Sequence, residues 1–191
     1  MGSRNRKRGK GHALGLTHEK VVSAALDMVD REGVEGLRMR ALASQIGCDP
    51  MAIYHFVPNK AALLDAITEH LEREGAPPGE DVTDWRVALQ EFAYKQLAVA
   101  LRHPNAIPLF TLRVSDNPAT TATHKWLQTL FEGLQLPDPL HAMRLYASGI
   151  NGVLLNYFAI RARTPDAERI AQTLMKDMVS AICSRLSERA R

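Results

Sequence analysis

Cysteine is scarce in this 191-residue sequence, which has only Cys48 and Cys183. The two lie far apart and belong to no Cys-x-x-Cys or mixed Cys/His spacing, which structural zinc sites and disulfide frameworks need. The histidines His103, His124 and His141 are not spaced as a ligand set either. We therefore expect free thiols in a reducing compartment, no metal and no other cofactor.

Long apolar runs are also absent. No stretch approaches the roughly 20 apolar residues that a membrane-spanning helix requires. The first residues are basic, but no apolar core of a signal peptide follows them. We expect a protein of the cytoplasm that has no membrane partner.

Motifs of catalytic sites are missing as well. The sequence has no glycine-rich phosphate loop, no HExxH, no nucleophile spaced to a base and no pair of acid–base carboxylates. Its 46% hydrophobic and 24% charged residues are ordinary for a folded chain. We expect a binding protein and not an enzyme.

Positive charge is concentrated near the N-terminus. Residues 1–60 hold ten basic and six acidic side chains, whereas residues 61–191 hold 14 basic and 15 acidic ones. This asymmetry favours a polyanionic partner for the N-terminal part, although a solvated charged tail has the same composition.

The periodicity of the apolar residues predicts an all-α fold with roughly nine helices and no strand. Residues 1–16 are expected to form a flexible basic arm. Residues 17–74 are expected to form a first domain and residues 80–191 a second, because Gly75-Ala-Pro-Pro-Gly79 is the clearest break in the chain.

Local signals give the helix ends of the first domain. Thr17 is a good N-cap for a helix that Gly33 ends, and a second helix follows over Met39–Ile46. Gly47 permits a tight turn, after which Asp49 caps a third helix with Pro50 at its first position. A fourth helix is expected after its cap, Asn59.

The second domain is expected to be helical throughout. Apolar stripes predict a helix from Trp85 that ends at Pro104 and a short segment over Ile107–Leu112. They also predict a helix through Trp126 that ends at Pro137, a long helix over residues 138–162 and a last helix that opens at Pro165.

Two short helices around a glycine turn, from Met39 to Phe56, indicate a helix-turn-helix. In that motif the second helix enters the major groove of DNA while the first crosses the backbone. Arg38 and Arg40 open the first of these helices, and Lys60 opens the fourth, where free N–H groups favour an anion. The same helix pair also occurs in proteins that bind no DNA.

Residues 17–70 resemble the N-terminal domain of the tetracycline-repressor (TetR) family of transcriptional regulators. The matching residues, at spacings specific for that domain, are Gly33, Leu42-Ala43, Gly47, Tyr54, Lys60 and Leu63. The resemblance implies a DNA-binding domain followed by a helical domain that binds a ligand and forms a dimer.

The resemblance also assigns the DNA contacts. Pro50–Phe56 corresponds to the recognition helix, Met51, Ala52 and His55 to residues that face the bases, and Tyr54 and Lys60 to phosphate contacts. The full set of expected DNA-binding residues is Arg38, Arg40, Pro50, Met51, Ala52, Tyr54, His55 and Lys60.

One position departs from the family. Many members have Ser or Thr at the start of the second helix, where the hydroxyl caps the helix and contacts a phosphate, whereas this sequence has Arg38 and Met39. Arg38 can replace the phosphate contact with a charge-assisted one, but the cap is lost. Pro50, Met51 and Ala52 offer few donors, so readout is expected from Arg40 and His55, with methyl contacts to thymine.

The resemblance implies that the last two helices form a four-helix bundle with a second copy. The sequence agrees, because Ile170, Leu174, Met178, Ile182 and Leu186 form a stripe at four-residue spacing. Gly149 and Gly152 would let another backbone approach the preceding helix. Packing within one subunit is the alternative.

A cavity for a small apolar effector is expected among the central helices, although each of its candidate residues is also typical of plain core. The candidates are Phe92, Gln96, Phe110, Trp126, Leu130, Met143, Tyr146 and Asn151. Together these expectations describe a homodimeric repressor that binds a palindromic operator in double-stranded DNA and that an effector releases. The alternative is a ligand-independent DNA-binding regulator that a protein partner controls.

Overall fold

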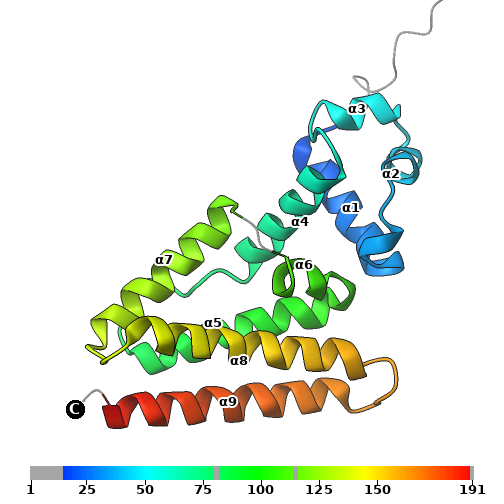
Figure 1. Cartoon of the computed structure of the whole chain (residues 1–191). Helices are drawn as coiled ribbons and strands as arrows, with labels where there is room; N and C mark the ends of the chain where they lie inside the picture. Colours follow the sequence, from blue (N-terminus) through cyan, green and yellow to red (C-terminus); the bar gives the residue numbers. More distant parts are fainter. Residues whose placement is uncertain (1–14, 80–81, 114–115, 190–191) are drawn as a thin grey trace, which may run out of the picture. The chain divides into compact units, whose positions relative to one another are not determined.

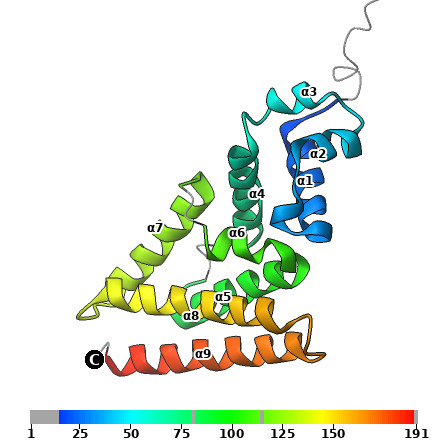
Figure 2. The ribbon, with the colours of Figure 1, turned by 45° about the vertical axis from the view of Figure 1, so that its right-hand side comes forward.

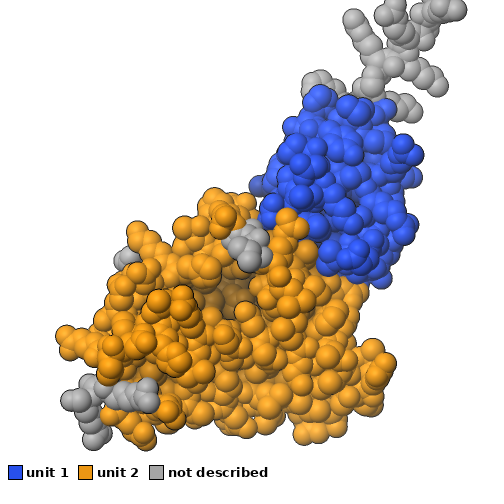
Figure 3. Space-filling view, viewed as in Figure 1, with its two compact units in different colours: residues 1–67 blue, residues 68–191 orange. Residues whose placement is uncertain are grey.

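The computed structural model describes residues 15–79, 82–113 and 116–189, and within them it is helical and without strands (Figure 1). The all-α fold class is thereby confirmed. The chain divides into two compact units, residues 1–67 and residues 68–191 (Figure 3). Most of the basic arm expected over residues 1–16 lies outside the described residues.

Unit 1 contains α1 (His18–Glu32), α2 (Met39–Ile46), α3 (Pro50–Tyr54) and the first half of α4 (Lys60–Glu74). Its apolar core draws on all four helices. The fully buried side chains include Val21, Ala25, Val29, Leu42, Ile53, Leu63 and Ile67.

The helix ends of unit 1 follow the local signals of the sequence. The Thr17 side chain accepts a hydrogen bond from Lys20 N, and Asn59 Oδ1 accepts one from Ala62 N at 2.8 Å. Each cap satisfies a backbone N–H that has no partner inside its helix. The expected caps at these two positions are confirmed.

Two glycines are required where the chain reverses between helices. Gly47 follows α2 with φ 77° and ψ 32°, in the left-handed region that side chains with a Cβ adopt with strain. Gly36 is required for a different reason, since a Cβ there would collide with the Cβ of Glu32.

Unit 2 contains α5 (Trp85–Arg102), α6 (Ile107–Thr111), α7 (Pro118–Gly133), α8 (Pro139–Ile160) and α9 (Ala167–Arg189). α8 and α9 run side by side in opposite directions (Figure 2), and α5 packs against both. α6 and α7 pack against α8. This leaves α8 as the central helix of the unit.

Tyr146 of α8 lies at the centre of this core. It is fully buried, its hydroxyl donates a hydrogen bond to Leu89 O, and burial raises its pKa. The rings of Phe92 and Phe131 pack against it, with centroids 6.4 and 5.9 Å away. A buried tyrosine whose hydroxyl finds an acceptor stabilises the packing of α5 on α8.

Three helix ends differ from the sequence interpretation. α3 ends at Tyr54 instead of Phe56, and α9 begins at Ala167 instead of Pro165. α7 begins at Pro118, well before the stripe that starts at Trp126, because Asn117 caps it by accepting from Thr120 N at 2.9 Å. Polar first turns such as this one lack the apolar periodicity that reveals a helix.

Candidate nucleic-acid interface and ligand cavity

The turn between α2 and α3 exposes one face of a very short helix. Asp49 Oδ1 accepts a hydrogen bond from Met51 N at 2.8 Å, and Pro50 takes the first position of α3, where a missing N–H loses nothing. Ile53 is completely buried and holds α3 on the unit. The burial of Ile53 therefore determines which side of α3 faces solvent.

The solvent side of α3 carries the residues expected to contact DNA. Met51 is 66% exposed and Tyr54 40% exposed, and His55 is exposed just after the last turn. Pro50 and Ala52 are half-buried. A surface of this kind offers apolar contacts and an imidazole, with few hydrogen-bond donors.

Arg38 and Arg40 are both exposed at the start of α2. Arg38 occupies the N-cap position with extended backbone, φ −131° and ψ 128°, and its side chain makes no capping hydrogen bond. The loss of the cap that the sequence predicts is confirmed. The side chain therefore remains available to an anion near the free N–H groups of α2.

Lys60 begins α4 and is half-buried. Its Nζ donates to the Val34 carbonyl oxygen at 3.4 Å, across the turn that follows α1. This long hydrogen bond uses one of the three N–H groups of the ammonium, so donors remain for a second acceptor.

α2 is tied to α1 through a residue that the sequence did not single out. Gln45 accepts a hydrogen bond from Arg31 Nη2, and its own Nε2 donates to Ala24 O at 3.3 Å. An exposed glutamine carries no sequence signal for such a role.

Unit 2 contains a cavity of about 110 Å³ among five helices. Its lining comes from the second half of α4 and from α5, α6, α7 and α8. The residues that line it are Glu72, Phe92, Gln96, Phe110, Thr120, Thr123, His124, Leu127, Ala147, Ile150 and Asn151.

Four of the eight expected cavity residues line this space: Phe92, Gln96, Phe110 and Asn151. The other four lie elsewhere. Tyr146 is a core residue, and Trp126 packs on Phe92 with ring centroids 5.3 Å apart. Leu130 packs on the core from α7, and Met143 lines a separate hollow beside Phe131.

The polar lining includes residues that the sequence did not indicate. Burial raises the pKa of Glu72, and the Thr120 hydroxyl opposes this shift. Thr120 Oγ1 is itself buried and makes no hydrogen bond of ordinary geometry within the described chain. Gln96 Nε2 donates to Gly75 O at 2.9 Å, which fixes its amide beside the cavity.

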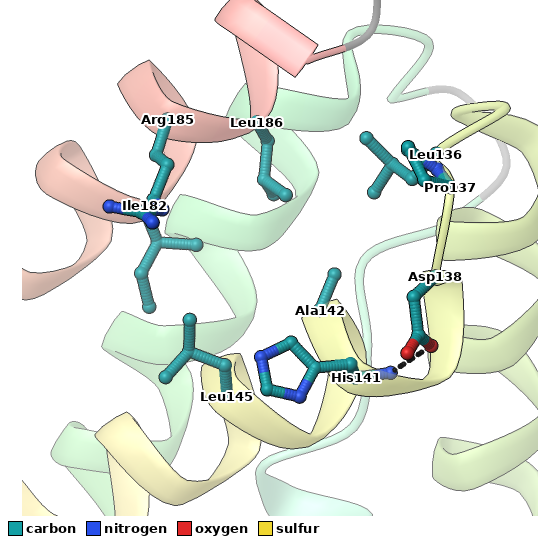
Figure 4. A pocket seen from close by; sticks show the side chains of 9 residues that line it. All are labelled: Leu136, Pro137, Asp138, His141, Ala142, Leu145, Ile182, Arg185 and Leu186. Carbon is teal, nitrogen blue, oxygen red and sulfur yellow. Dashed lines mark hydrogen bonds between the residues drawn. The ribbon is translucent and has the colours of Figure 1, made fainter.

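A second cavity, of about 270 Å³, opens where the start of α8 faces the end of α9 (Figure 4). Leu145 and Ile182 line it from the two helices, and Arg185 borders it. Asp138 caps α8 there by accepting from His141 N at 2.9 Å. Its lining comes from fewer helices than that of the central cavity, and none of the eight expected residues belongs to it.

Among the described residues, no group of three or more histidine, cysteine, aspartate or glutamate side chains could hold a metal ion. No described helix is both long and apolar enough to cross a membrane.

The architecture is that of an all-helical protein with a helix-turn-helix in its first unit and a cavity within its second. Residues 21–67 match the family model described as bacterial regulatory proteins, tetR family. Tetracycline repressor protein class G of Vibrio anguillarum is 37% identical over 159 residues, which cover 80% of this chain and 75% of that protein. The chain belongs to the tetR family, as the resemblance implied.

Other relatives match over shorter spans. The HTH-type transcriptional repressor DrrR1 of Streptomyces coeruleorubidus is 35% identical over 70% of this chain and 50% of its own length. An HTH-type transcriptional regulator of Saccharopolyspora erythraea is 32% identical over 59% of this chain and 48% of its own length. The chain thus spans about half the length of these two relatives.

Solved structures share the fold. A TetR variant from Acinetobacter baumannii AYE, in complex with minocycline, has a TM-score of 0.73 at 23% identity and covers 91% of this chain and 98% of its own. ActR of Streptomyces coelicolor, in complex with actinorhodin, has a TM-score of 0.72 at 18% identity, with 92% and 98% covered.

Proposed function

We propose that this protein is a cytoplasmic, homodimeric transcriptional repressor that binds a palindromic operator and leaves it when a small molecule enters the central cavity. The observation that carries the proposal is the capped, five-residue α3, which presents Met51, Tyr54 and His55 outward on a unit that matches the family model. We propose a binding role only, without catalysis.

In this proposal α3 enters the major groove. His55 and Arg40 are the donors for base edges, and Met51 and Ala52 contact thymine methyl groups. Arg38, Tyr54 and Lys60 bind phosphates on either side. Pro50 presets the first turn of α3 and so orients the residues that follow it.

The dimer forms through α8 and α9. Leu145 is 47% exposed and Leu174 41% exposed, and Ile170, Met178 and Ile182 of α9 are only half-buried. Another copy of the same strip would cover these apolar groups in a four-helix bundle. A two-fold dimer then places two recognition helices on the two half-sites of a palindrome.

The two glycines of α8 contribute differently to this interface. A Cβ on Gly149 would lie 2.8 Å from Sδ of Met178, so Gly149 serves the packing of α9 within the same chain. Gly152 is exposed and has no neighbouring atom within 4 Å of such a Cβ. Gly152, rather than Gly149, is therefore the position where a partner helix can approach.

In this proposal, α4 couples ligand binding to DNA binding, because one helix carries residues of both sites. This helix begins at Lys60, which we assign to a phosphate, and carries Glu72, which lines the cavity. A ligand that binds better to a conformation with a shifted α4 would draw the population away from the DNA-bound form. The relatives crystallised with minocycline and actinorhodin support an effector of aromatic, drug-like character.

The test begins with selection of binding sites from fragmented bacterial genomic DNA. We expect a palindromic duplex whose affinity falls steeply between 50 and 200 mM salt, by orders of magnitude if six or more phosphates are contacted. Drug-like aromatic compounds are then screened for thermal stabilisation and for release of that duplex. A protein without preference for any duplex would contradict the DNA-binding assignment, and stabilising compounds that leave the complex intact would contradict release.

A further inference from the structure

The central cavity contains a single acidic side chain, Glu72. Its remaining polar groups are the amides of Gln96 and Asn151, the hydroxyls of Thr120 and Thr123, and the imidazole of His124. No lysine or arginine lines it. The cavity therefore has the electrostatic character that a positively charged guest prefers.

Glu72 differs from the neighbouring acids of α4. Glu69 forms an ion pair with Arg73, and Glu74 forms one with Arg102 at 2.8 Å. None of the ion pairs among the described residues includes Glu72, and burial raises its pKa. Of these three carboxyls, the one that faces the cavity is the one left without a cation.

The half-buried Glu72 carboxylate, without a cation, has lost hydration that the Thr120 hydroxyl offsets only in part. A guest with a positive charge would supply the missing partner, and the hydrogen bond would be charge-assisted. A guest with a carboxylate would meet repulsion from Glu72 or would require its protonation. A bare metal ion finds only one carboxylate here, and no site of three ligands exists among the described residues.

The rest of the lining is apolar and partly aromatic. Phe92 and Phe110 reach the cavity from α5 and α6, and Leu127 and Ile150 reach it from α7 and α8. These side chains suit an aromatic ring system, and the faces of the two phenylalanine rings add attraction for a nearby cation. The recognised molecule thus needs both an apolar body and a charged end.

We propose that the effector is an aromatic amine that is protonated at neutral pH, with its ammonium group bound by Glu72 and its rings held between Phe92 and Phe110. This inference rests on the proposed function, because it names the chemical class of the effector of the same cavity. The Oε1 atom of Gln96, whose Nε2 donates to Gly75 O, and the amide of Asn151 would hydrogen-bond to polar substituents on the rings.

The experiment compares probes that share one ring system but differ in charge: positive, neutral and negative. The aminomethyl, hydroxymethyl and carboxylate derivatives of benzene, whose single ring suits a cavity of about 110 Å³, and of naphthalene are titrated into the full chain by calorimetry at pH 7. We expect the ammonium form to bind at least tenfold more tightly than the alcohol, and the carboxylate to bind most weakly. In Glu72→Gln the ammonium form should fall to the affinity of the alcohol, while the alcohol binds as before.

Glu91→Gln is the matched control. Glu91 is exposed on α5 and does not line the cavity, and its replacement removes the same charge from the chain. It should leave the tenfold preference intact. Circular dichroism and operator binding are measured to check that both variants are folded.

The outcomes separate the two proposals. An alcohol or carboxylate that binds as tightly as the ammonium form overturns the cationic effector while leaving a ligand-binding cavity in place. A preference for the cation that survives in Glu72→Gln overturns the role of Glu72. If no probe of either ring size binds, both the cationic effector and the ligand-binding role of the cavity are overturned.

Discussion

Lys60 and His55 lie close together in sequence, but their surroundings differ. Lys60 is half-buried against the Val34 carbonyl, whereas His55 is exposed just after α3. A lysine held at the start of a helix is suited to a phosphate, which has the same charge in every sequence. An exposed imidazole beside the recognition helix can reach the edge of a particular base.

Replacing each residue by alanine should separate the two roles. Lys60→Ala is expected to weaken binding to all duplexes by a similar factor and to reduce the salt dependence by about one phosphate. His55→Ala is expected to relax the preference at one base position of each half-site, by about 1–3 kcal/mol. Affinities measured on operators with every single-base change distinguish these outcomes, and identical profiles for both variants would contradict the assignment.

Glu72 should also affect the pH dependence of stability. Its pKa in the folded protein lies above the ordinary 4.5, so the ionised form is disfavoured by folding. Stability is therefore expected to fall, relative to Glu72→Gln, as the pH rises from 4.5 through the raised pKa of Glu72. Urea unfolding of both proteins between pH 4.5 and 8 measures the difference, and a difference in stability that stays constant as the pH rises, or that grows in favour of the wild type, would refute it.

At the scale of single elements, α2 and α3 begin in different ways. Asp49 caps α3, whereas Arg38 precedes α2 without a capping hydrogen bond. Serine at an N-cap typically stabilises a helix by about 1 kcal/mol relative to a residue that cannot cap. The sequence has thus placed a cation where stability alone would favour a hydroxyl.

Arg38→Ser should move stability and DNA affinity in opposite directions. The new cap is expected to raise the free energy of unfolding by about 1 kcal/mol. Loss of the guanidinium is expected to weaken operator binding, since a serine hydroxyl makes a weaker contact to phosphate. Arg38→Ala is the control, because it removes the charge without adding a cap. Unfolding curves and operator titrations of both variants test this, and the absence of any weakening in both would show that Arg38 does not contact DNA.

The elements also show what the sequence could predict and what it could not. Gly47, Asp49 and Asn59 act on backbone groups a few residues away, so local patterns were enough to predict the end of α2 and the starts of α3 and α4. The cavity depends instead on how five helices converge. Phe92 and Trp126 are both apolar residues of helical stripes, and only packing decides that Phe92 lines the cavity. Glu72 gave no sequence signal, since a glutamate on α4 is ordinarily solvated.

At the scale of the whole molecule, α8 and α9 expose apolar side chains, among them Leu145 and Leu174, that nothing in the subunit covers. The buried side of α9, which includes Ala171, Met175 and Val179, already packs inside unit 2. Leu174 of the same helix is 41% exposed, whereas Met178 is half-buried and packs against that core. Helices with two apolar faces are expected where a subunit core and a subunit interface lie on opposite sides.

Leu174→Asp and Gly152→Arg should therefore disrupt the dimer without unfolding the subunit. Leu174 is 41% exposed and Gly152 has open space around it, so neither change disturbs the packing of a single chain. In the dimer, each would bury a charge without a partner, which is strongly destabilising. Leu140→Asp provides a control, because Leu140 is also exposed on α8 but lies near its first turn, away from Gly152.

Sedimentation should show folded monomers for the two interface variants and a dimer for the control. Because the two half-sites of an operator are bound together, these monomers should also lose operator affinity by orders of magnitude, although unit 1 is intact. A monomer binds one half-site only, so it loses the binding free energy that the recognition helix of the second subunit contributes. A soluble monomer that binds the full operator as tightly as the wild type would show that the α8–α9 surface does not place the recognition helices.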